Sequence, residues 1–312
     1  MKINLRDSVA VCSRSFSRNE ILRDELTNLY ANVSFNDAGA SLHGDDLVNF
    51  LRGHTKAIVA LEEINDFVLS QLPDLGVISK YGVGLDKIDL QSLKKFNKRL
   101  GWTPGVNRRS VSELVVAFAI SLLRGVHESN KEVLSGFWKQ YVGGQLTGKT
   151  LGIVGCGNVG QDLVHLLKPF NCEILVNDIK DYPDFFAKHS LKRSSIDNLF
   201  ARADIITLHV PLDEGTRNMI QEPLISLMKP TSFLINIARG GVVDELALKK
   251  ALLDKKIAGA AFDVFSAEPP ADMELLSLPN FLATPHIGGS SIEAVLAMGR
   301  SAIDGLDVNS IP

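Results

Sequence analysis

The sequence contains little cysteine. Its 312 residues include three cysteines, Cys12, Cys156 and Cys172, and no two of them have the C-x-x-C spacing of a metal site. We therefore expect three reduced thiols, as is typical of a cytoplasmic protein, and no bound metal.

Long apolar runs are also absent. The longest, Leu114–Leu123, has ten residues, whereas a membrane-spanning helix needs roughly 20. The first seven residues contain no apolar stretch of the kind that a signal peptide needs. We expect no membrane association, and we interpret Leu114–Leu123 as a buried core helix or a subunit-interface helix.

Neither charge sign dominates. The chain has 33 Lys and Arg against 36 Asp and Glu, a net charge of −3, which excludes the concentrated basic surface of a nucleic-acid-binding protein. A hydrophobic share of 45% with 22% charged residues is typical of a globular protein, and the length allows two domains of ordinary size.

Short apolar runs alternate with longer helical patterns in the first hundred residues. This alternation favours a parallel α/β architecture. The expected strands are 9–12, 57–60 and 76–79, and the expected helices are 20–30 and 64–72. Residues 101–107, with one proline and two glycines, have the composition of a linker.

A second βα series follows a long helix. That helix is expected over residues 110–129, with Ser110 as N-cap and Glu113 completing a capping box. Six strands come next, at 150–154, 172–176, 205–209, 233–237, 258–262 and 281–284. Six strands with crossover helices predict a doubly wound sheet.

A glycine motif lies at the first of these strands. Gly155-Cys156-Gly157-Asn158-Val159-Gly160 separates the apolar strand from a helical pattern, and Asp178 ends the next strand 18 residues after Gly160. The glycines bring backbone N–H groups and a helix N-terminus against a pyrophosphate, and the acid accepts hydrogen bonds from ribose. Asp178 would repel a 2′-phosphate, so it favours NAD over NADP, although Lys180 nearby weakens that argument. The alternative is a glycine-rich turn followed by an unrelated surface acid.

Three charged residues follow later strands of the same series. Arg239, Glu268 and His286 each come after a buried strand, and ligands of open α/β sheets bind beyond such strand ends. Taken alone, Arg239 could form a structural salt bridge, Glu268 could lie in a solvated loop, and His286 could be an ordinary surface histidine. Together, on successive strand ends, they indicate a catalytic site.

These motifs carry a family resemblance. The order of the glycine motif, NIARGGVVDE (236–245), AFDVFSAEPP (261–270) and TPHIGGSS (284–291) resembles the D-isomer-specific 2-hydroxyacid dehydrogenases, as does KYGVGLD (80–86). Within that family, the stretches 107–113, 123–126 and 226–230 are similar to those of 3-phosphoglycerate dehydrogenases.

The resemblance implies two Rossmann-like domains. Residues 103–287 would form the dinucleotide-binding domain with its doubly wound sheet. Residues 1–102 and 288–312 would form a smaller, flavodoxin-like substrate domain. We expect one helix after residue 290, no appended regulatory domain, and a homodimer formed through the dinucleotide-binding domain with Leu114–Leu123 as the contact.

The resemblance also implies residue roles. Arg239 would bind the substrate carboxylate and C2 oxygen through its planar fork. His286 would be the general acid or base, and Glu268 would orient it and favour its protonated form. The substrate-binding residues would be Tyr81, Val83, Gly84, Arg239 and His286. The residues that bind NAD would be Gly155, Gly157, Asn158, Val159, Gly160, Asp178, His209, Val210, Pro211, Thr216, Ile237, Ala238, Asp263 and Gly288, with Asp263 holding the nicotinamide amide.

The leading substrate is 3-phosphoglycerate with its keto form, 3-phosphohydroxypyruvate, which would place the enzyme in serine biosynthesis. Alternatives are a hydroxypyruvate or glyoxylate reductase, a formate or phosphite dehydrogenase, and a non-enzymatic NAD-sensing scaffold. Glu268 disfavours a formate enzyme, which carries Gln there. We expect cationic side chains near residues 60–63 if the substrate carries a phosphate, but this chain has Glu62 and Glu63 there. The cations that could bind the phosphate instead are Lys80, Arg108 and Arg109.

Overall fold

The computed structural model describes residues 3–312, which form two compact units. Unit 1 runs up to Asn107 and includes Ile292–Pro312, and unit 2 is Arg108–Ser291. The bounds of the two units lie a few residues from the domain boundaries expected from the sequence. That the units are independently folding domains remains a prediction.

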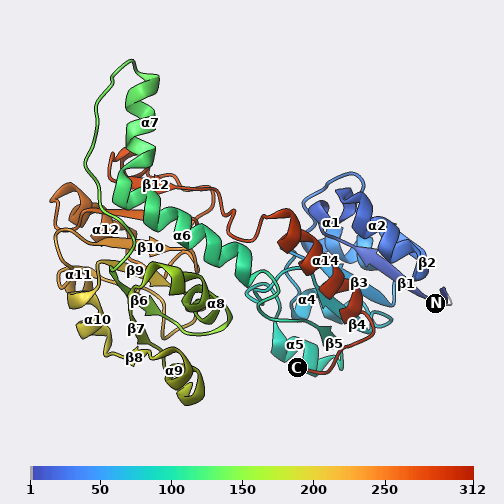
Figure 1. Cartoon of the computed structure of the whole chain (residues 1–312). Helices are drawn as coiled ribbons and strands as arrows, with labels where there is room; N and C mark the ends of the chain where they lie inside the picture. The colour runs from blue at the N-terminus through green and yellow to red at the C-terminus, as the bar shows by residue number, and fades with distance from the viewer. Residues whose placement is uncertain (1–2) are drawn as a thin grey trace. The chain divides into compact units, whose positions relative to one another are not determined.

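Unit 1 contains a five-stranded parallel sheet in the order β2-β1-β3-β4-β5 (Figure 1). The strands are β1 (Asn4–Val11), β2 (Tyr30–Phe35), β3 (Lys56–Val59), β4 (Val77–Lys80) and β5 (Arg99–Gly101). This order is the flavodoxin-like one, as expected.

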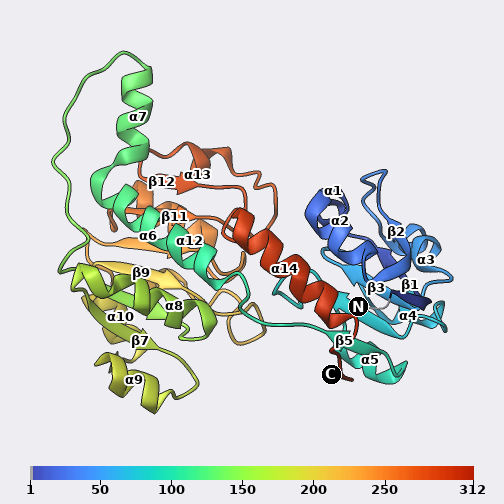
Figure 2. The same cartoon turned by 45° about the vertical axis from the view of Figure 1, so that its right-hand side comes forward.

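Helices cover both faces of this sheet. They are α1 (Arg14–Arg18), α2 (Glu20–Thr27), α3 (Gly44–Leu51), α4 (Asp66–Ser70), α5 (Leu90–Lys95) and α14 (Ile292–Gly305). Successive side chains of a strand point to opposite faces. Accordingly Val9 and Val11 pack with α1, α2 and α14, whereas Ala10 packs with α3, α4 and α5. Figure 2 shows α14, the single expected C-terminal helix, beside these N-terminal elements.

Two strands of unit 1 were not expected. β2 is an edge strand with mostly half-exposed or exposed residues, so its sequence YANVSF has no continuous apolar run. β5 has three residues and ends at Gly101, within the predicted linker. A Cβ at Gly101 would lie 2.1 Å from the Gly305 oxygen, so close approach of α14 requires glycine there.

Unit 2 contains a seven-stranded parallel sheet in the order β12-β11-β10-β9-β6-β7-β8. The strands are β6 (Thr150–Val154), β7 (Glu173–Asn177), β8 (Lys192–Arg193), β9 (Ile205–Leu208), β10 (Phe233–Asn236), β11 (Gly259–Phe262) and β12 (Phe281–Ala283). The six predicted strands are confirmed to within one residue at each end. β8 is the addition, a two-residue exposed edge strand without an apolar signal. The two sheets confirm the α/β fold class.

Helices again lie on both faces of the sheet. Those of unit 2 are α6 (Arg108–Arg124), α7 (Val126–Leu134), α8 (Asn158–Leu167), the 3₁₀ turn η1 (Lys168–Phe170), α9 (Pro183–His189), α10 (Ile196–Arg202), α11 (Glu222–Ile225), α12 (Glu245–Leu253) and α13 (Met273–Ser277). One apolar core contains α6 and α8, and the other contains α10, α11, α12 and α13.

The long helix departs from its prediction at both ends. It begins at Arg108, so Ser110 lies inside it and donates its hydroxyl hydrogen to the Gly288 carbonyl oxygen at 2.6 Å instead of capping the helix. It ends before Gly125, whose φ of +59° is left-handed, and α7 continues at a bend of 62°. Within residues 3–312 no single helix is long and apolar enough to cross a membrane; α6 and α7 satisfy that criterion only as this bent pair.

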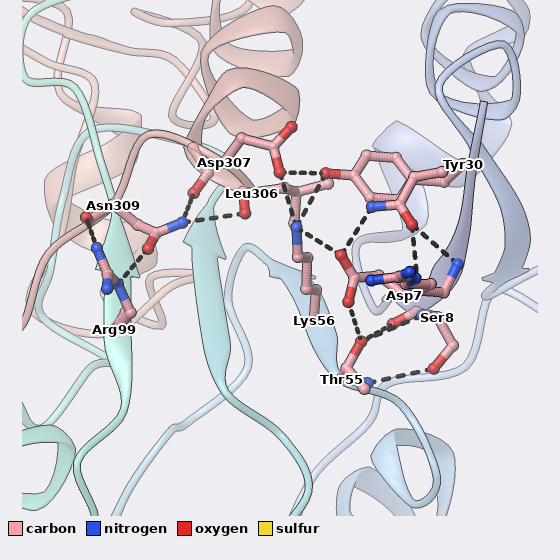
Figure 3. A network of polar contacts seen from close by, with 12 residues as sticks. Asp7, Ser8, Tyr30, Thr55, Lys56, Arg99, Leu306, Asp307 and Asn309 are labelled. Atoms are coloured by element: carbon pink, nitrogen blue, oxygen red, sulfur yellow. Dashed lines mark hydrogen bonds and ion pairs between the residues drawn. The ribbon is translucent and has the colours of Figure 1, made fainter. Parts of the chain in front are cut away.

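A polar network joins the C-terminal segment to the sheet of unit 1 (Figure 3). The Lys56 ammonium contacts Asp307 at 2.7 Å, Asp7 at 3.0 Å and the Tyr30 hydroxyl at 3.2 Å. Burial lowers the pKa of Lys56, but its hydrogen bonds to Asp307, Asp7 and Tyr30 outweigh burial, so the pKa lies above its ordinary value. One cation therefore links β1, β2, β3 and the chain after α14.

We predict that Lys56→Met lowers the free energy of unfolding, measured by urea denaturation, by about 2 kcal/mol, because Asp7 and Asp307 lose their shared cation. Water offsets part of the loss, since the Asp307 side chain is 69% exposed. The matched control is Lys95→Met, whose surface pair with Asp66 should contribute at most about 0.5 kcal/mol. Equal losses in the two variants would contradict this role of Lys56.

Candidate functional site

The glycine motif turns the chain from β6 into α8. Gly155 has a φ of +95°, and a Cβ there would lie 2.7 Å from the His209 oxygen. A Cβ at Gly160 would lie 2.3 Å from the Gly155 oxygen, whereas Gly157 faces open space. No side chain caps α8, so its first N–H groups are available to an anion. These features fit a bound pyrophosphate.

Asp178 lies at the end of β7, next to this loop. Its carboxylate accepts hydrogen bonds from the backbone N–H groups of Cys156 at 2.6 Å and Lys180 at 2.7 Å. A carboxylate has about four lone-pair sites, so acceptor capacity remains for ribose hydroxyls. Burial, with Asp178 adding to it, raises the pKa of the Cys156 thiol to about 12. Cys156 is therefore an uncharged part of the loop.

Arg193 is a neighbour of Asp178 that sequence reasoning missed. Its guanidinium donates to the Asp178 carbonyl oxygen at 3.3 Å and contacts Asp181 at 3.5 Å. The unexpected strand β8 brings it there, so no local sequence signal indicated it.

The loop after β9 borders the glycine motif. His209 is half-buried, its Nε2 lies 3.0 Å from the Thr207 hydroxyl, and burial lowers its pKa to about 3. A Val210 methyl group would lie 3.1 Å from a Cβ at Gly155. Thr216 donates its hydroxyl to the Pro211 oxygen at 2.6 Å and closes this loop on itself.

His286 and Glu268 form a direct pair. The His286 Nδ1 lies 2.9 Å from one Glu268 carboxylate oxygen, and the other oxygen accepts from the Phe265 N–H at 3.2 Å. The His286 side chain is 52% exposed, and its Nε2 has no partner among residues 3–312. The pair can therefore exchange a proton at Nε2 while Glu268 fixes the ring at Nδ1.

Asp263 fixes the loop that carries His286. His286 has a φ of +55°, a backbone conformation that residues other than glycine rarely adopt. The Asp263 carboxylate, 1% exposed, accepts from the N–H groups of Ile287 and Gly288, each at 2.7 Å, and from the Thr284 hydroxyl. Its backbone oxygen accepts from the His286 N–H at 2.9 Å. Asp263, expected as a nicotinamide ligand, thus already has three acceptor contacts within the protein.

Arg239 follows β10, and Asn236 holds its loop. The Asn236 side chain, 1% exposed, donates to the Arg239 oxygen at 3.0 Å and accepts from the Ala238 N–H at 3.2 Å. A Cβ at Gly240 would lie 1.8 Å from the Phe265 oxygen, so this loop lies directly against the one leading to Glu268. Sequence reasoning missed Asn236, although a polar residue at the end of a buried strand was a visible signal.

A cavity of about 440 Å³ adjoins the histidine. Its lining includes Asp263, Phe265, Glu268, Thr284 and His286. Ile237 and Ala238 are buried beside β10, and Gly288 is tightly packed, since a Cβ there would lie 3.1 Å from the Asp263 carboxylate. Unit 2 thus brings Asp263, Glu268 and His286 together, with the Arg239 loop against the Glu268 loop.

The predicted substrate loop lies in unit 1 after β4. Gly82 has a φ of +122°, and the N–H groups of Val83 and Gly84 have no hydrogen-bond partner among the residues that the structure describes. Two unpaired N–H groups suit a carboxylate. Tyr81 differs from expectation, because its ring is 7% exposed and packs edge-on against Phe16. Its side chain belongs to the core, and its backbone N–H donates to the Val59 oxygen at 2.8 Å, so its role towards substrate remains a prediction.

The three candidate cations for a substrate phosphate are engaged elsewhere. Arg109 contacts Asp162 of α8 at 3.0 Å, and Arg108 lies 4.0 Å from the same carboxylate. Lys80 is 6% exposed and donates to the Ala60 oxygen. Two arginines at a helix start thus have a local explanation, an ion pair between α6 and α8.

Comparison with known proteins agrees with this geometry. Residues 116–288 match the family described as "D-isomer specific 2-hydroxyacid dehydrogenase, NAD binding domain". The chain is 33% identical over 294 residues to a hydroxypyruvate reductase of Thermotoga maritima, covering 92% of this chain and 95% of that protein.

Two further relatives extend the comparison. A D-3-phosphoglycerate dehydrogenase of Methanocaldococcus jannaschii is 38% identical over 240 residues, which cover 74% of this chain and 45% of that enzyme. The D-lactate dehydrogenase of Aquifex aeolicus, whose structure was determined with NAD and lactic acid, has a TM-score of 0.82 and 25% identity, with 96% and 93% of the two chains covered. The chain therefore belongs to the D-isomer specific 2-hydroxyacid dehydrogenase family and carries that family's NAD-binding domain.

Proposed function

We propose that the protein catalyses hydride transfer between NAD and C2 of a small D-2-hydroxy or 2-keto acid, with His286, Glu268 and Arg239 as its catalytic residues. The observation that carries this proposal is the 2.9 Å contact between Glu268 and His286, which leaves His286 Nε2 directed away from its partner and half-exposed. Bound NADH supplies the hydride in the reductive direction.

His286 would move the proton. During reduction negative charge grows on the C2 oxygen, and a protonated Nε2 neutralises it by donating a proton. In the reverse direction neutral Nε2 removes the hydroxyl proton. Glu268 stabilises the imidazolium and fixes the ring, because its oxygen is bonded to Nδ1.

Arg239 would bind the substrate carboxylate and the C2 oxygen. A guanidinium presents two parallel N–H groups, and Asn236 fixes the backbone from which this one projects. The N–H groups of Val83 and Gly84 would contribute further hydrogen bonds to the carboxylate. The residues proposed for NAD are those of the glycine motif, Asp178, the loop after β9, and the Ile237, Ala238, Asp263 and Gly288 positions.

3-Phosphoglycerate with its keto form remains the leading substrate, and the resemblance of residues 107–113 to phosphoglycerate dehydrogenases supports it. Hydroxypyruvate or glyoxylate is the second candidate, supported by the hydroxypyruvate reductase that matches nearly the full chain. A non-enzymatic NAD-sensing role would show as tight NADH binding without turnover on any of these keto acids.

A homodimer formed through unit 2 completes the proposal. Of the large apolar residues of α6, four are buried within unit 2, three are half-buried and Ile120 is exposed, so Leu114–Leu123 alone offers little surface. α7 and the chain after it project from unit 2 (Figure 1), with exposed Leu134, Phe137 and Trp138. Such a patch of large apolar side chains is typical of a subunit contact.

We predict that His286→Asn lowers kcat for keto-acid reduction by roughly 10²- to 10⁴-fold, because the proton donor is lost. NADH binding, followed by fluorescence, should be retained. The control is His54→Asn, whose ring bonds Ser34 in unit 1 and should leave turnover unchanged. A fully active His286→Asn enzyme would contradict the assignment.

For Asp178→Asn, we predict that the preference for NADH over NADPH, expressed as the ratio of kcat/KM values, falls by roughly tenfold, since one charge-assisted hydrogen bond and one repulsive charge are lost. Asp181→Asn, three residues along the same loop, is the matched control. A wild-type preference for NADPH, or an unchanged ratio in Asp178→Asn, would overturn this role.

Sedimentation at micromolar concentration should show a dimer for the natural chain. Trp138→Glu should shift it towards monomer, because a buried charge opposes association. The control is Leu246→Glu, which alters a leucine that is 71% exposed on α12. A monomeric natural chain would refute the dimer.

A further inference from the structure

Unit 1 contains a second polar cavity, of about 580 Å³, that none of the proposed roles uses. It lies where β1 and β3 end, and its lining comes from α1, the loop after β2 and the loop after β3: Ser13, Arg14, Ser15, Arg18, Asn19, Ser41, Leu42, Ala60, Leu61 and Glu62. In the parallel sheet order β2-β1-β3-β4-β5, the strand order reverses between β1 and β3, and open α/β sheets bind ligands at this point.

Two arginines of α1 face the cavity without a partner. Arg14 and Arg18 are four residues apart on one helix face, and neither guanidinium has a hydrogen bond or ion pair among residues 3–312. Arg23, on the next helix, contrasts with them, because it pairs with Asp37 and lies over the Phe35 ring. Like charges at this helical spacing repel each other, so the arrangement is favoured when an anion lies between them.

The rest of the lining suits an anion with several oxygens. Ser13, Ser15 and Ser41 supply hydroxyl groups, and Asn19 supplies a side-chain amide. Glu62 is the only acid in the lining of this described cavity; it is 8% exposed, and its carboxylate accepts from the Ala60 N–H at 2.6 Å. Two guanidinium groups against one carboxylate leave the cavity positive.

The cavity is linked to the predicted substrate loop within unit 1. Phe16 of α1, next to Ser15, packs edge-on against the Tyr81 ring with centroids 5.6 Å apart. Tyr81 directly precedes Gly82, Val83 and Gly84, the backbone proposed to bind the substrate carboxylate. Residues of α1 therefore fix the position of this loop as well as lining the cavity.

We infer that this cavity binds a tetrahedral oxyanion, a phosphate or sulfonate, on C3 of the 2-hydroxy acid, with Arg14 and Arg18 as specificity-determining residues. This inference rests on the proposed function and specifies its substrate class. It also accounts for the absence of cations at residues 60–63, because α1 supplies them.

The test compares steady-state kinetics on three keto acids: 3-phosphohydroxypyruvate, 3-sulfopyruvate and hydroxypyruvate. The variant is Arg14→Gln/Arg18→Gln, and the control is Arg6→Gln, which removes an exposed arginine from the opposite, amino-terminal half of β1. We expect KM for the preferred anionic substrate to rise by about 10- to 100-fold in the double variant, with kcat nearly unchanged. KM for hydroxypyruvate should stay within about twofold, because both arginines act only on the distal anion.

The phosphate and sulfonate arms identify which oxyanion the cavity takes. Inorganic phosphate or sulfate should also inhibit the natural enzyme competitively and the double variant much less. An unchanged KM for both anionic substrates, or an equal rise for hydroxypyruvate, would overturn the inference. If the natural enzyme reduces hydroxypyruvate but discriminates against both anionic substrates, the inference fails and the proposed function stands. If it reduces none of the three, the proposed function itself fails.

Discussion

The candidate active site depends on one carboxylate, that of Asp263, which fixes the conformation of the His286 loop. Asp263 accepts the N–H groups of Ile287 and Gly288 and, through its backbone oxygen, that of His286. These bonds hold His286 at a φ of +55°, a conformation that costs roughly 1–3 kcal/mol for a residue other than glycine. The imidazole is thereby presented to Glu268 with its other nitrogen available. Without these hydrogen bonds the loop could relax. The imidazole would then lose its orientation, although His286 and Glu268 themselves were unchanged.

The parallel sheet supplies the second constraint. Arg239, Asp263 and His286 follow β10, β11 and β12, which are neighbours in the sheet and end at the same edge. Neighbouring strands lie about 5 Å apart, so the loops that carry these residues begin side by side. Gly240 lets the first loop contact the second, because any side chain there would clash with Phe265. Chemistry-bearing residues far apart in the sequence thus come from one short stretch of the sheet edge.

Buried strands and the glycine motif could be predicted because their signals are local. Ile205–Leu208 is a continuous apolar run, and Gly155 through Gly160 has a fixed spacing between a strand and a helix. β2 and β8 could not be predicted, since edge strands exposed to water need no apolar run. Ser110 had the sequence pattern of an N-cap, but α6 begins two residues earlier. The Ser110 hydroxyl therefore donates to the Gly288 carbonyl oxygen instead of capping the helix.

Part of the candidate site could likewise be predicted from the sequence, and part of it could not. His286, Glu268 and Arg239 were predicted from their places after buried strands, and their roles remain proposals. The internal bonds of Asp263 and the lack of partners at Arg14 and Arg18 depend on how distant segments pack, which no local pattern encodes. The most direct test is a crystal structure with NADH and a slowly reacting 2-keto acid. We expect the C2 carbonyl oxygen within hydrogen-bond distance of both Arg239 and His286 Nε2; a keto acid bound with that oxygen away from both groups would contradict the proposed catalytic roles.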